Sequence, residues 1–130
     1  MTPTSPPLPL VIEVVLQEPE VDWYDLTDIY VETYWLPAVG PTCWAVARRM
    51  FHVGVAAGYA ELVEHETEIL GRMVGVGVSQ LSSALWRLTR FGLSDWLRIG
   101  DVPLLSLRST WPPLPRRHAD RFSDFLPVPE

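Results

Sequence analysis

Apolar residues recur along the chain at two spacings, and each spacing predicts a type of element. Residues 10–16 (LVIEVVL) are rich in β-branched side chains, which favours a strand. Between residues 26 and 36 the mostly apolar positions follow one helical face, and Pro37 is expected to stop that helix. A second amphipathic helix is predicted from residue 41 to near Gly58, with these positions on its apolar face: Cys43, Ala47, Met50, Phe51 and Gly54.

The second half of the chain continues with short elements. Residues 59–65 alternate weakly and predict a short strand, and residues 67–75 predict a helix ended by glycine. Another helix is expected over residues 79–91. Two apolar runs, 96–99 and 102–107, flank Gly100-Asp101 and predict a hairpin, in which Pro103 indicates an edge strand. The proline-rich residues 1–9 predict an extended arm, and residues 116–125 a last short helix.

Residues 67–91 carry the pattern of two helices joined by a tight turn. Gly71 supplies a small residue where the helices approach, and Gly75 supplies a residue able to take positive φ at the turn. The segment TEILGRMVGVGVSQLSSALWRLTRFGL resembles the helix-turn-helix of bacterial winged-helix transcriptional regulators. The following WLRIGDVPLLSLR corresponds to the wing of that family, and YAELVEH to its short first strand. The resemblance covers roughly residues 40–108.

The expected fold is therefore α+β, mainly α: a winged helix-turn-helix with an N-terminal arm, strand and helix. We divide the chain into residues 1–36, the arm, strand and aromatic helix; residues 37–110, the winged helix-turn-helix; and residues 111–130, a proline-rich segment with a short helix.

Charge is distributed unevenly along the chain. All ten basic residues are arginine and the net charge is −6, which argues against a protein that coats nucleic acid non-specifically. Residues 1–34 hold seven acids and no base, whereas residues 69–121 hold eight arginines against three acids. An anionic partner is therefore expected at the second half. The alternative is two solvated faces of opposite sign.

The resemblance implies binding to double-stranded DNA, with the helix 79–91 in the major groove. Its outward side chains would meet base edges, and Gln80 is suited to adenine. Arginines late in the helix suit phosphates, and those flanking the wing suit the backbone or minor groove. The candidate DNA-binding residues are Ser79, Gln80, Ser82, Ser83, Trp86, Arg87, Arg90, Arg98 and Arg108. The alternatives are a solvated helix face for the serines and surface salt bridges for single arginines.

One subunit would read too few base pairs to define a genomic site, so we expect a homodimer on two half-sites. The aromatic segment DWYDLTDIYVETYW is the candidate for dimerisation. Core packing of an N-terminal helix is an equally good explanation of that segment.

Other classes of function find less support in the sequence. The three histidines lie far apart, no metal or phosphate-loop motif is present, and the single Cys43 on an apolar face is expected to be a core residue. We expect no enzyme activity, no cofactor and no metal. No run reaches the roughly 20 apolar residues of a membrane span, and a cytoplasmic protein is expected. The competing hypothesis is a winged-helix protein-interaction module that uses an exposed Trp86 and Trp111.

Overall fold

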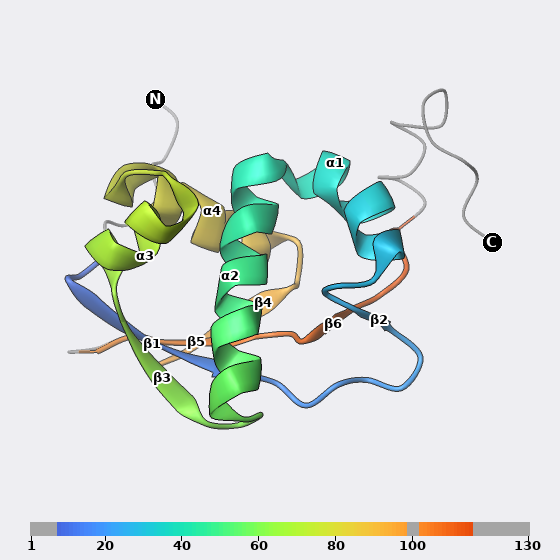
Figure 1. Ribbon diagram of the computed structural model, residues 1–130, viewed down its shortest axis with the longest axis horizontal. Helices are drawn as coiled ribbons and strands as arrows, with labels where there is room; N and C mark the ends of the chain where they lie inside the picture. The colour runs from blue at the N-terminus through green and yellow to red at the C-terminus, as the bar shows by residue number, and fades with distance from the viewer. Residues whose placement is uncertain (1–7, 99–101, 116–130) are drawn as a thin grey trace.

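A computed structural model describes residues 8–98 and 102–115 and shows an α+β fold (Figure 1). Its main sheet has four strands in the order β3, β1, β5, β4, with the bounds Leu62–Glu66, Val11–Leu16, Leu104–Leu107 and Ser94–Arg98. Helices α2 (Pro41–Ala57), α3 (Thr67–Val74) and α4 (Val78–Arg90) lie on one side of it. A second, two-stranded sheet pairs β2 (Tyr24–Asp25) with β6 (Thr110–Trp111).

Strand β1 confirms the predicted strand and occupies an internal position in the sheet. Ile12, Val14 and Leu16 are buried, because alternate side chains of a strand point to the same face. The strand runs antiparallel to β3 and parallel to β5. The segment expected as an N-terminal arm and strand therefore contributes part of the common core.

The prediction that Pro103 marks an edge strand is wrong. Strand β5 lies inside the sheet, between β1 and β4. Pro103 immediately precedes β5, where its carbonyl accepts a hydrogen bond from the Glu13 amide at 2.9 Å. Proline lacks only the donor, so it is accommodated at the start of an internal strand.

The helix expected over residues 26–36 is partly π-helical and ends later than the sequence predicts. It consists of a π-helical segment, η1 (Val31–Trp35), followed directly by α1 (Leu36–Val39). Pro37 does not stop the helix, because it lies in the first turn of α1, where a backbone N–H is not needed. The chain leaves the helix at Gly40, whose φ of +93° favours glycine.

Helix α2 confirms the second predicted helix. Each position assigned to its apolar face is buried, and Val46 is buried with them. The helix crosses β1 closely at Gly54, where a Cβ atom would lie 3.0 Å from the Leu16 Cβ. The long helix therefore rests on the strand that precedes it in the sequence.

The two predicted helices on either side of Gly75 are confirmed as α3 and α4. Gly75 has φ +79° and ψ +28°, the left-handed conformation expected at the turn. The Val76 amide donates to the Gly71 carbonyl at 2.8 Å, which folds the turn back onto α3. A Cβ atom at Gly71 would lie 2.6 Å from the Val76 carbonyl oxygen. Position 71 requires glycine because a Cβ atom would clash with the Val76 carbonyl oxygen. Position 75 requires glycine because its φ is positive.

The predicted hairpin is present as antiparallel β4 and β5, displaced by about two residues from the expected runs. Its turn at Gly100-Asp101 lies outside the described residues, as do the proline-rich arm before Leu8 and the helix expected at 116–125.

The aromatic segment makes ring contacts within the chain. Tyr24 and Tyr30 stack with ring centroids 3.9 Å apart. Trp35 is buried against Trp111 at 5.6 Å and donates its indole N–H to the Pro112 carbonyl at 2.7 Å. These contacts join η1 to β6. Homodimerisation through this segment stays a prediction.

Candidate nucleic-acid interface

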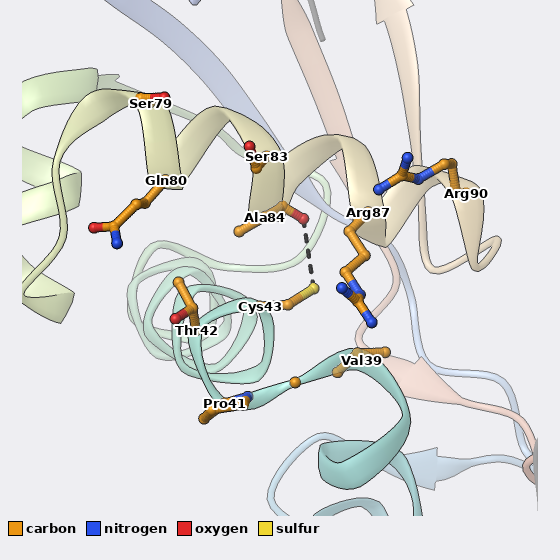
Figure 2. Close-up of a pocket in the computed structure, with 11 residues that line it drawn as sticks. Val39, Pro41, Thr42, Cys43, Ser79, Gln80, Ser83, Ala84, Arg87 and Arg90 are labelled. Carbon is orange, nitrogen blue, oxygen red and sulfur yellow. Dashed lines mark hydrogen bonds between the residues drawn. The ribbon is translucent and has the colours of Figure 1, made fainter. Parts of the chain in front are cut away.

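Helix α4 presents one polar strip to solvent. Ser79, Gln80, Ser83, Arg87 and Arg90 are exposed, and their spacing of three and four residues places them along the same side of the helix. Figure 2 shows these side chains along the helix, with the arginines at its C-terminal end. The opposite side is anchored in the core by Leu81, Ala84, Leu85 and Leu88.

The polar strip borders a pocket of about 360 Å³ between α4 and the beginning of α2 (Figure 2). Among the residues that the structure describes, neither aspartate nor glutamate lines it. Its lining residues are Val39, Gly40, Pro41, Thr42, Cys43, Ser79, Gln80, Ser83, Ala84, Arg87 and Arg90. The pocket therefore combines hydroxyl, amide and guanidinium groups without an opposing carboxylate.

Arg87 and Arg90 make this pocket electropositive. The Arg87 Nη2 donates to the Ala38 carbonyl at 3.4 Å, and its guanidinium lies 5.9 Å from the Phe91 ring centre. Neither arginine forms an ion pair within residues 8–98 and 102–115. Thr42 and Cys43, in the first turn of α2, also line this pocket, and the N-terminal end of a helix carries partial positive charge.

Cys43 lies at the base of the pocket as a structural group. Its thiol donates to the Ala84 carbonyl at 3.4 Å and so joins α2 to α4. Burial raises the pKa of Cys43 to about 12, although Arg87 and Arg90 oppose part of that rise. The thiol is therefore protonated at neutral pH and is not a nucleophile.

Ser82 does not belong to the predicted interface. Its side chain is 6% exposed, so the expectation that it contacts bases is wrong. Ser82 lies three residues before Leu85, on the same side of the helix, and is covered where α4 packs on the rest of the chain. Helical spacing places residue 82 at the edge of the apolar face, so the sequence did not decide whether its side chain is buried or exposed.

The two tryptophans expected to be exposed have partners within the chain. Trp86 is half-buried and packs against Trp96 of β4, with ring centroids 5.4 Å apart. Trp111 is fully buried, so the expectation that it is exposed is wrong. Trp111 belongs to β6 of the small sheet and its ring packs against Trp35, a contact that only the tertiary structure brings about.

The two wing arginines contact the N-terminal segment. Arg98 Nη2 pairs with Glu13 at 2.6 Å, and Arg98 Nε donates to the Val102 carbonyl at 2.9 Å. Arg108 Nε donates to the Gly92 carbonyl at 2.8 Å, and its guanidinium lies 5.0 Å from the Trp23 ring centre. Neither of them lines the pocket beside α4, and Glu13 offsets the charge of Arg98.

The sequence reasoning missed the contribution of α2 to the site. The sequence predicts only that a helix begins at residue 41, although the start of a long helix carries partial positive charge. The signal was present, but its position beside Arg87 depends on how α2 packs on α4.

In the part of the chain that the structure describes, no group of three or more His, Cys, Asp or Glu side chains is arranged to hold a metal ion. Among those same residues, no helix has both the length and the apolar character needed to cross a membrane.

Comparison with known proteins gives a similarity of fold. No protein-family model and no curated protein sequence matches the chain. A solved structure of primosome protein DnaB (residues 1–300) from Geobacillus stearothermophilus is similar, with a TM-score of 0.59 and 14% sequence identity. The match covers 95% of this chain and 53% of that chain, so this protein spans about half of its structural neighbour. At this identity the likeness concerns the fold alone.

Proposed function

We propose that this chain is a sequence-specific DNA-binding protein, a transcriptional regulator that inserts α4 into the major groove. One observation carries the proposal: an exposed helix face ends in two arginines without ion-pair partners among the described residues, beside a pocket that no carboxylate lines. In a protein of net charge −6 such a surface is suited to a polyanion.

The order of elements supports a winged helix-turn-helix. Helix α2, strand β3, helices α3 and α4, and strands β4 and β5 follow one another as that fold requires. Strand β1 is an addition, placed between β3 and β5. The close turn at Gly71 and Gly75 presents the beginning of α4 to solvent.

The α4 strip divides into two functions by its chemistry. Gln80 offers a donor and an acceptor for the edge of adenine, and Ser79 and Ser83 can donate to or accept from neighbouring bases. Gln80 also accepts a hydrogen bond from the Gly77 amide at 3.3 Å, which holds its side chain at the start of the helix. Arg87 and Arg90 are placed for phosphates, which fix the register of the helix on the duplex.

The proposal includes a homodimer on two half-sites, a cytoplasmic location and no catalytic activity. The interaction-module hypothesis receives less support, because Trp111 is buried and Trp86 packs against Trp96. Those two side chains were its proposed anchors.

The test is duplex binding measured by fluorescence anisotropy over a range of salt concentrations. By counterion release, loss of one phosphate contact costs about eightfold in affinity at 0.1 M salt and flattens the salt slope by about 0.9. Arg87→Ala and Arg90→Ala should each show this loss for every duplex sequence. Gln80→Ala should instead weaken binding to a selected site more than to random DNA.

Arg72→Ala is the matched control, because Arg72 lies on α3 and is already paired with Glu68 at 2.7 Å. It should change affinity less than threefold. If the wild-type protein retains no duplex at low salt, or if all three arginine variants behave alike, the proposed function is wrong.

A further inference from the structure

A second electropositive groove lies on the other side of α2. It has a volume of about 380 Å³ and is bounded by the outward side of α2 and the C-terminal end of α3. Like the first pocket, it is not lined by any aspartate or glutamate of the described part of the chain. Its lining residues are Trp44, Ala45, Arg48, Arg49, His52, Met73 and Val74.

The arginines of this groove are held in place by contacts that do not neutralise them. The Arg48 guanidinium lies 5.0 Å from the Trp44 ring centre, a cation–π distance. Arg49 Nη2 donates to the Met73 carbonyl at 3.3 Å, at the end of α3. Over residues 8–98 and 102–115 neither of them is in an ion pair. Their charges therefore remain for an outside anion.

The two grooves share the beginning of α2. Thr42 and Cys43 line the pocket beside α4, and Trp44 and Ala45 line the groove beside α3. A small anion would occupy one groove only. A nucleic-acid strand carries charge at regular intervals, so it can place phosphates in both while it passes the first turns of α2.

We propose that the groove between α2 and α3 binds backbone phosphates of the same DNA that α4 reads, with Arg48 and Arg49 as the phosphate ligands. This inference rests on the proposed function. Guanidinium groups suit phosphate because they are planar, always charged and able to donate two hydrogen bonds at once. His52 adds an exposed nitrogen donor at the edge of the groove. The contact contributes affinity and register rather than base recognition.

The experiment measures anisotropy of a fluorescein-labelled 30-base-pair duplex, in a selected and in a scrambled sequence. The variants are Arg48→Gln with Arg49→Gln, the same two positions changed to lysine, and Arg72→Gln. Two lost contacts should weaken binding roughly 60-fold at 0.1 M salt and flatten the salt slope by about 1.8, equally for both sequences. The lysine variant should keep the wild-type slope, and Arg72→Gln should change affinity less than threefold.

Thermal unfolding of each variant verifies that the fold is retained. Amide chemical shifts of the wild-type protein provide a second measurement, and duplex addition should move the signals of Arg48, Arg49 and Met73.

If the glutamine variant binds as the wild type does while Arg87→Ala is impaired, this inference is wrong and the α4 interface stands. If Arg72→Gln loses as much affinity as each arginine removed from the groove, only the overall charge matters and the groove is not a binding site. Failure of the wild-type protein to bind any duplex overturns both proposals.

Discussion

At the scale of single residues, His65 is the buried side chain with the clearest consequence for stability. It lies on β3 opposite Ile12 of β1 and is 9% exposed. Burial lowers the pKa of His65 below its ordinary value, because the charged imidazolium loses its hydration. The folded protein therefore favours the neutral form.

This shift predicts a pH dependence of stability with a definite sign. Below about pH 6.5 the unfolded chain binds a proton that the folded chain resists, so stability is lost as the pH falls through the folded pKa. Melting temperatures between pH 8 and pH 5 should fall more steeply for the wild type than for His65→Leu. Parallel curves for the two proteins would show that His65 does not contribute.

Residue identity alone could not separate Ser79, Ser82 and Ser83. All three are serines in the first half of one helix, and two are exposed while Ser82 is buried. The difference arises because Ser82 shares its side of α4 with Leu85, which faces the core. The identity of the residues suggested base contacts, and their packing decided which side chains are available.

At the scale of elements, the α3–α4 turn depends on glycine for two separate reasons. Helix propensity predicts that Gly71→Ala stabilises α3, since glycine in a helix interior costs about 0.5–1 kcal/mol relative to alanine. The contact at 2.6 Å with the Val76 carbonyl predicts the opposite. Backbone cannot move aside as a flexible side chain can.

We therefore expect Gly71→Ala to lower the free energy of unfolding by about 1–3 kcal/mol, measured by urea denaturation. Gly77→Ala is the matched control, because a Cβ atom there meets open space at an ordinary φ of −79°. It should cost less than about 1 kcal/mol, from the weaker N-cap. Stabilisation by Gly71→Ala would contradict the close approach of α3 and the turn.

Elements with a sustained period were predictable, and irregular ones were not. The faces of α2, α3 and α4 repeat at helical spacing over two or more turns, so their positions follow from local physics. The helix around Pro37 was expected to end too early because proline stops a helix in its interior, whereas Pro37 lies in the first turn of α1. The edge position expected for the strand after Pro103 failed because strand order is not a local property.

At the scale of the whole molecule, β1 joins parts of the chain that the sequence suggested were separate. Among the described strands of the main sheet, β3 pairs only with β1, and β5 pairs with β1 and β4. Removing β1 would therefore leave β3 unpaired and β5 with one neighbour. Ile12, Val14 and Leu16 also belong to the single hydrophobic core. The first strand is thus needed by every later element that packs on the sheet.

A fragment of residues 37–110 should therefore fail to fold on its own, although it spans the expected winged helix-turn-helix. A fragment of residues 8–115, which keeps all the described elements, should fold. Circular dichroism and thermal unfolding distinguish the two outcomes by the presence or absence of a cooperative transition. Cooperative melting of the 37–110 fragment would show that β1 is dispensable.

The sequence by itself determined helices α2, α3 and α4, the four strands of the main sheet to within a few residues, and the presence of a glycine turn. These features follow from the period of apolar positions and from backbone sterics within a few residues. Only the tertiary structure decided that β1 enters the sheet, that Glu13 pairs with Arg98, and that the beginning of α2 lies beside Arg87. Those contacts join residues 40 to 90 positions apart, and no local pattern specifies them. The candidate interface depends on both levels: the sequence of α4 places the polar strip on one side of that helix, and the packing of α2 on α4 forms the pocket.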